Sequence, residues 1–175
     1  MKKRWIAMAA AGVVLAGCQT TARMPMETVR DVDLNRFMGA WYVIANIPTF
    51  LEKGAHGAVE AYRLQADGTV DITFTYRADS FDGEIKTLRS KGFVQDTSNA
   101  VWGVQFVWPF KADYRITHLA GDYSQTVIAR EKRDYVWIMA RTPTIPQADY
   151  QRLLDVVADR GYDTAKVQKV PQKRP

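Results

Sequence analysis

Several short segments of the chain alternate apolar and polar residues, which is typical of strands in an antiparallel sheet. From residue 70 to residue 76 every second side chain is apolar and those between are polar. Residues 101–108 and 114–119 repeat this period of two. The turn signal Ala-Asp-Gly at residues 66–68 makes residues 58–64 the expected partner strand of a hairpin. Short strands separated by turn signals predict an antiparallel barrel or sandwich.

Two later segments follow other patterns. Residues 135–140 are apolar on both faces, which predicts a strand that is covered on its outer side as well. Residues 146–160 have the i, i+3, i+4, i+7 spacing of an amphipathic helix, and we expect this helix to cover that strand. We also expect a helical turn over residues 33–38 and a short strand at residues 167–170.

The N-terminus has the three-part composition of a bacterial secretory signal. Residues 2–4 are basic, and residues 5–16 are uncharged and mostly apolar. This run is too short for a transmembrane helix of roughly 20 residues. It ends in Leu-Ala-Gly-Cys, which resembles the lipobox of bacterial lipoproteins. The resemblance implies a signal peptide at residues 1–17, a lipid on Cys18 and a tether over residues 18–30. The alternative is a buried helix that happens to end in cysteine.

Removing the signal changes the charge and the partners that it suggests. The chain has 24 basic and 19 acidic residues, and three of the basic residues lie in the signal. The mature chain therefore keeps 21 basic residues and a net charge of +2. No basic stripe survives, so a nucleic-acid partner has no electrostatic support. One cysteine and two histidines exclude a Cys-cluster zinc site, and we expect neither a metal nor a cofactor.

Three short motifs resemble those of the lipocalins. Gly39 and Trp41 match the G-x-W signature, Asp122 and Tyr123 stand where the family has a T-D-Y-like turn, and Arg141 stands at its third motif. Residues 134–144 look especially like the bacterial outer-membrane lipocalins and their relative apolipoprotein D. The resemblance implies that the tryptophan closes the barrel floor and that the arginine lies across its ring, which are structural roles.

The same resemblance defines the fold and its extent. It implies an all-β fold, an eight-stranded antiparallel up-and-down barrel with one C-terminal helix packed outside. The lipocalin domain is expected over residues 31–170, followed by a basic tail at residues 171–175. In the predicted strands, alternate residues point inward. This register gives eight candidates for contact with a ligand: Phe74, Tyr76, Trp102, Val104, Phe106, Tyr114, Ile116 and His118. The alternative is that they fill a closed core. Trp108 is also placed inside.

Three functions compete at this point. The first is a lipid-anchored envelope protein that binds, stores or transports a fatty acid or lysophospholipid in its barrel. Because Gln19 is not the aspartate that retains lipoproteins in the inner membrane, we expect this protein to be located in the outer membrane. A homodimer is possible. The second is a lipid-modifying enzyme using His118 or His56 with Asp79 or Glu84, although no catalytic motif supports it. The third is a structural lipoprotein with a closed barrel.

Overall fold

The computed structural model describes residues 24–173. The predicted signal peptide at residues 1–17 and the predicted lipid site Cys18 lie outside the described residues. Within the described range no helix is both long and apolar enough to span a membrane.

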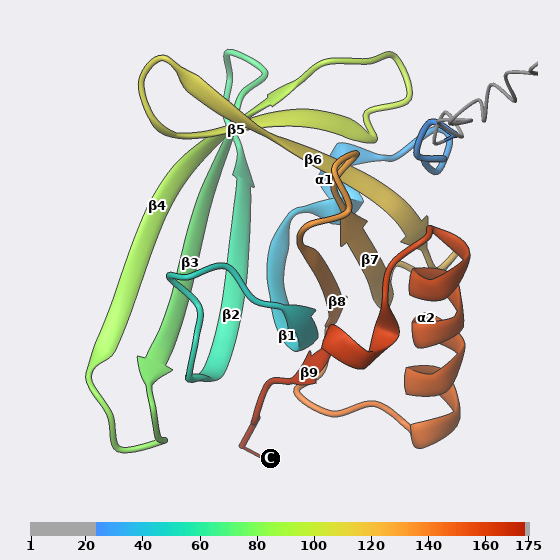
Figure 1. Cartoon of the computed structure of the whole chain (residues 1–175). Helices are drawn as coiled ribbons and strands as arrows, with labels where there is room; N and C mark the ends of the chain where they lie inside the picture. The colour runs from blue at the N-terminus through green and yellow to red at the C-terminus, as the bar shows by residue number, and fades with distance from the viewer. Residues whose placement is uncertain (1–23, 174–175) are drawn as a thin grey trace, which may run out of the picture.

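The described chain forms a closed antiparallel barrel (Figure 1). The sheet order is β2-β3-β4-β5-β6-β7-β8-β1, and β1 also pairs with β2, which closes the ring of eight strands. A ninth, two-residue strand pairs with β1. The predicted all-β barrel is therefore confirmed. The strands are β1 (Gly39–Ile47), β2 (Ala55–Leu64), β3 (Val70–Ala78), β4 (Ile85–Val94), β5 (Val101–Val107), β6 (Phe110–Leu119), β7 (Gln125–Ala129), β8 (Val136–Ala140) and β9 (Gln168–Lys169).

Helix α2 (Gln147–Asp159) packs on the outside of the barrel, as predicted (Figure 1). Leu153 and Val157 are fully buried in one hydrophobic cluster with Val127 of β7 and Ile138 of β8. This second layer explains why residues 135–140 are apolar on both faces. The helix ends before Gly161, whose φ of +83° is a conformation that glycine adopts without strain.

Helix α1 (Leu34–Phe37) closes one end of the barrel. Asp33 caps it, because its carboxylate accepts hydrogen bonds from the backbone N–H groups of Asn35 and Arg36. Phe37 is fully buried, and its ring lies 5.2 Å from that of Trp41 and 5.7 Å from that of Trp102. This aromatic plug fixes the closed end, so any ligand cavity must open at the opposite end. The remaining helical segment is the turn η1 (Thr164–Lys166).

Candidate functional site

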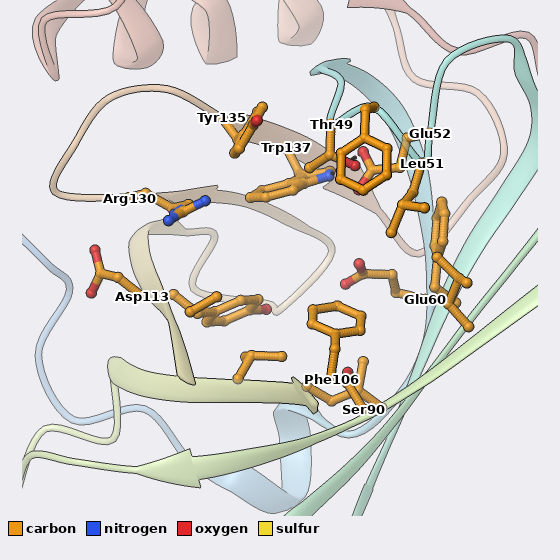
Figure 2. A pocket seen from close by; sticks show the side chains of 17 residues that line it. Thr49, Leu51, Glu52, Glu60, Ser90, Phe106, Asp113, Arg130, Tyr135 and Trp137 are labelled. Atoms are coloured by element: carbon orange, nitrogen blue, oxygen red, sulfur yellow. Dashed lines mark hydrogen bonds between the residues drawn. The ribbon is translucent and has the colours of Figure 1, made fainter. Parts of the chain in front are cut away.

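A cavity of about 250 Å³ lies between the barrel strands (Figure 2), and none of the plug residues Phe37, Trp41 and Trp102 lines it. Most of its wall is apolar. The mouth is formed partly by Phe50, Leu51 and Phe106, which keep 78%, 42% and 54% of their surface exposed. The lining residues are Thr49, Phe50, Leu51, Glu52, Glu60, Ile72, Phe74, Leu88, Ser90, Val104, Phe106, Ala112, Asp113, Tyr114, Arg130, Tyr135 and Trp137. An apolar wall with few polar groups is the usual build of a small-molecule site.

The structure places four of the eight predicted cavity residues on this wall. They are Phe74, Val104, Phe106 and Tyr114. Trp102 and Ile116 point inward but lie in the fully buried core and do not line the cavity. Tyr76 also points inward, yet its hydroxyl donates a 2.5 Å hydrogen bond to the carbonyl of Leu51. Tyr76 therefore holds the β1–β2 loop at the mouth.

The prediction that His118 lines the barrel interior is wrong, and a β-bulge is the reason. Ile116 pairs with Ile128, but His118 pairs with Val127, so β6 carries one extra residue between them. An extra residue turns the following side chains to the other face of the sheet. Val127 packs in the outer cluster with α2, and His118 faces that side. Burial, followed by the nearby charges of Arg152 and Arg160, lowers the pKa of its imidazole.

The placement of Trp108 inside the barrel is also wrong. Trp108 follows β5 at the tip of the β5–β6 hairpin, and 81% of its surface is exposed. The register of β5 and β6 shifts between Val104 and Val107, so the alternation of the strand does not continue to its tip.

Sequence reasoning missed the polar residues of the wall. Glu60, on β2, pairs with Trp41 and Phe74, so it shares their inward face. Glu60 stands two residues before Tyr62 in a predicted strand, so the period of two already places both side chains on the same face. Glu52 lies in the β1–β2 loop and Arg130 in the β7–β8 loop, where no periodic pattern indicates direction.

Glu60 is half-buried and forms a hydrogen-bonded group with two buried tyrosines. The Tyr62 hydroxyl donates to a carboxylate oxygen of Glu60, and the Tyr62 and Tyr114 hydroxyls lie 2.9 Å apart. Burial away from water raises the pKa of Glu60 to about 7, with the charge of Glu52 adding to the effect. Burial also raises the pKa of both tyrosines well above the ordinary value. Figure 2 shows the Glu60 carboxylate pointing into the cavity.

Glu52 joins the mouth loop to two strands. Its carboxylate accepts 2.9 Å hydrogen bonds from the side-chain amide of Asn46 on β1 and from the indole N–H of Trp137 on β8. Burial raises the pKa of Glu52, and these donors oppose the rise. Asp113 points away from the cavity centre in Figure 2 and bonds Arg115 instead. Among the described residues of the wall, Arg130 alone carries a positive charge, and it pairs with Asp134 at 3.5 Å.

The two histidines do not form a catalytic pair with a carboxylate. His56 lies against the ring of Phe81, and its Nδ1 contacts the backbone carbonyl of Gly54. Over residues 24–173 neither His56 nor His118 hydrogen-bonds a carboxylate, and neither lines the cavity. The same range contains no group of three His, Cys, Asp or Glu residues that could hold a metal ion.

The motif residues meet at the closed end. The Arg141 guanidinium carbon lies 3.8 Å from the Trp41 ring centroid, a cation–π contact worth about 0.5–2 kcal/mol. Gly39 has a φ of +93°, and a Cβ there would lie 3.5 Å from the guanidinium. Asp122 accepts hydrogen bonds from Ser124, and the Tyr123 hydroxyl accepts one from the backbone N–H of Asp33. None of these side chains lines the cavity.

Comparison with known proteins gives one consistent picture. A family model described as a lipocalin-like domain matches residues 32–172. The chain is 31% identical to outer membrane lipoprotein Blc of Citrobacter freundii, over 95% of this chain and 94% of that one. It is 30% identical to apolipoprotein D of Bos taurus, over 78% and 75% of the two chains. The solved structure of insecticyanin from the tobacco hornworm superimposes with a TM-score of 0.67 at 12% identity, covering 87% of each chain.

Proposed function

Because this chain belongs to the lipocalin family, we propose that it binds one small lipophilic ligand inside its barrel, a fatty acid or a lysophospholipid. The observation that carries the proposal is the cavity with its largely apolar wall and exposed mouth. A closed structural barrel would have this space filled by side chains. Binding is favoured over the histidine-dependent catalysis considered above, since within residues 24–173 neither histidine lines the cavity or hydrogen-bonds a carboxylate.

The charges of the wall orient the ligand. Glu60 lies on the inward face of β2 beside the buried Trp41, and Arg130 lies in the β7–β8 loop. An anionic head would be repelled by the ionised carboxylate of Glu60 and attracted by Arg130. The acyl chain therefore enters first, and a carboxylate or phosphate head stays at the mouth.

The second part of the proposal is the location of the protein. We propose that Cys18 carries the lipid anchor and that the protein resides in the outer membrane of a Gram-negative cell. Support comes from the lipobox-like residues 15–18 and from relatives named as outer membrane lipoproteins. The basic tail at residues 171–175 has no part in this proposal.

Titration of residues 19–175 with saturated fatty acids and lysophospholipids of increasing chain length tests the binding function. This fragment contains the whole barrel and both hydrophobic clusters. Each buried methylene contributes about 0.8 kcal/mol before the costs of association. Affinity should rise with chain length and level off when the cavity is full. Native mass spectrometry of protein purified from its own membrane should show one retained ligand. Affinity that does not change with chain length, together with empty native protein, would contradict the proposal.

A further inference from the structure

The floor of the cavity contains a carboxylate in apolar surroundings, which an acyl chain alone does not require. Glu60 is opposite Trp41 on one side and Phe74 on the other. A polar group that loses water without gaining a hydrogen-bond partner is destabilising. A ligand that reaches this point must therefore hydrogen-bond the carboxylate, or its affinity is lowered by the cost of desolvating it.

The hydrogen count shows what kind of group the floor can accept. Tyr62 has one hydroxyl proton, and it donates that proton to Glu60. In the 2.9 Å contact between the two tyrosines, Tyr114 must then be the donor and Tyr62 the acceptor. The hydrogen bonds therefore run in one direction, from Tyr114 through Tyr62 to Glu60. The second carboxylate oxygen of Glu60 receives no hydrogen bond from the described residues.

No other charged or hydroxyl-bearing side chain of the wall, Thr49, Ser90 and Tyr135 included, donates a hydrogen bond to Glu60 in the described chain. Glu52 faces the cavity from the β1–β2 loop and is itself an acceptor. Asp113 is bonded to Arg115, and Arg130 is paired with Asp134. Above the Glu60 pKa of about 7 the carboxylate is ionised, and the floor is then a net acceptor that attracts hydrogen-bond donors and repels anions.

We propose that Glu60, Tyr62 and Tyr114 form a polar subsite at the cavity floor, which accepts a hydrogen bond from a hydroxyl or ammonium group at the buried end of an apolar ligand. This inference rests on the proposed binding function and makes it more specific. The preferred ligand then has two polar ends, an anionic head at the mouth and a donor at the far end of its chain.

Matched ligands test the subsite, because a terminal hydroxyl should maintain or raise affinity if the polar subsite exists and lower affinity if the cavity is purely apolar. Dodecanoic acid, ω-hydroxydodecanoic acid and ω-aminododecanoic acid share one head and one chain, and decanoic and tetradecanoic series cover neighbouring lengths. In a purely apolar cavity a terminal hydroxyl weakens binding, because it loses its water. In the wild-type fragment of residues 19–175 we expect the hydroxylated acid of the best-fitting length to bind at least as tightly as the plain acid.

Two substitutions separate the donor preference from packing. In Glu60→Leu the hydroxylated acid should bind about tenfold or more weakly than the plain acid, since a hydrogen bond to a charged group is lost. Glu60→Gln keeps an acceptor oxygen of similar shape, so it should keep the hydroxyl preference and lose the ammonium preference. Calorimetric titration at about pH 8.5, where the Glu60 carboxyl with its pKa of about 7 is ionised, gives the affinities. Thermal unfolding of each variant at the same pH checks that it is folded.

The outcomes distinguish the two proposals. If no acid and no methyl ester of these acids binds the wild-type protein, the proposed binding function is wrong. If the plain acids bind but the hydroxyl and amine weaken binding equally in wild type and Glu60→Leu, the ligand-binding function stands and the subsite is overturned. Glu60 would then serve only to hold Tyr62 and Tyr114.

Discussion

Arg141 covers the ring of Trp41 and bonds the backbone around it. One guanidinium nitrogen donates to the carbonyl of Ala40 at 2.8 Å, and another donates to those of Arg36 at 2.7 Å and Phe37 at 3.0 Å. The Trp41 indole N–H donates to the same Phe37 carbonyl at 2.8 Å. One cation from the end of β8 thus satisfies the carbonyls left open by α1 and ties the helix to β1.

We predict that Trp41 and Arg141 stabilise the fold without contributing to ligand affinity. Trp41→Ala should lower the free energy of unfolding by about 3–5 kcal/mol, as deletion of a buried aromatic ring does. Arg141→Ala should lower the free energy of unfolding by about 2–3 kcal/mol, because several backbone carbonyls lose a charged hydrogen-bond donor. Arg141→Lys should recover only part of this loss, since an ammonium cannot reproduce the planar fork. Urea denaturation measures these effects. Unchanged stability with lost ligand binding would reverse the assignment.

His118 provides a second prediction, on pH. Its pKa is lowered in the folded protein by burial and by Arg152 and Arg160, so the unfolded chain binds the proton more readily. The stability contributed by the neutral imidazole is present above the unfolded pKa of about 6.5 and is lost as the pH falls through the folded pKa. His118→Gln should therefore reduce the acid destabilisation and leave ligand affinity unchanged. Unfolding curves at about pH 7.5 and about pH 5 measure the first effect. If His118→Gln lost ligand affinity, His118 would have to contact the ligand in the cavity.

The sequence was informative where one periodicity held along a whole segment. The strand at residues 70–76 and the helix at residues 146–160 both have one apolar and one polar face, and both formed nearly as expected. The strand β4 has no such alternation, because both of its faces mix polar and apolar residues, and it had no strand prediction. The prediction of inward-pointing residues was wrong at His118, where one extra residue in β6 reverses the face of the following side chains. No residue type in the sequence marks this β-bulge.

Glu60 supports a third prediction, on stability. Its pKa rises from 4.5 to about 7 in the folded protein. Folding therefore favours the protonated form, and the stability that Glu60 contributes is lost as the pH rises from about 4.5 to about 7. Glu60→Gln has no carboxyl to ionise, so its stability relative to wild type should increase over this window by at most about 3 kcal/mol. Urea unfolding across the range measures the difference.

A matched control separates this effect from general loss of charge. Glu84→Gln makes the same chemical change on the exposed turn before β4, where the side chain is 72% accessible and pairs with Lys86. This variant keeps Glu60, so it should keep the loss of stability that Glu60 causes between about pH 4.5 and about pH 7. A constant difference between Glu60→Gln and wild type across the window would show that the Glu60 carboxyl titrates normally.

The fourth prediction concerns the anchor. Multiple acyl chains on Cys18, at about 0.8 kcal/mol for each buried methylene, should make membrane attachment effectively permanent. Cys18→Ser in the full chain should abolish lipid attachment and signal removal at this site. Metabolic labelling with a radioactive fatty acid and fractionation of inner and outer membranes measure both. Processed, membrane-bound Cys18→Ser protein would contradict the proposed anchor.

The last prediction identifies the tryptophan that reports ligand binding. Trp137 lines the cavity and donates its indole N–H to Glu52, whereas Trp102 is buried in the plug and Trp108 is exposed to solvent. A bound acyl chain would change the surroundings of Trp137 alone. Trp137→Phe should abolish most of the fluorescence change on fatty acid binding, and Trp108→Phe should preserve it. Calorimetry on the same variants shows whether binding itself persists.

Filling the cavity completes this test with a matched pair. Val104 lines the cavity, and Val107, on the same strand, keeps 69% of its surface exposed. Ile116 is unsuitable for this purpose, because it is fully buried in the core and enlarging it would strain the fold. Val104→Phe should lower the affinity for a long acyl chain by about tenfold, since roughly two methylenes lose their place. Val107→Phe should leave the affinity unchanged. If both variants bind with wild-type affinity and the fluorescence of Trp137 still changes, the acyl chain of the ligand lies outside the cavity. It would then contact Trp137 only at the mouth.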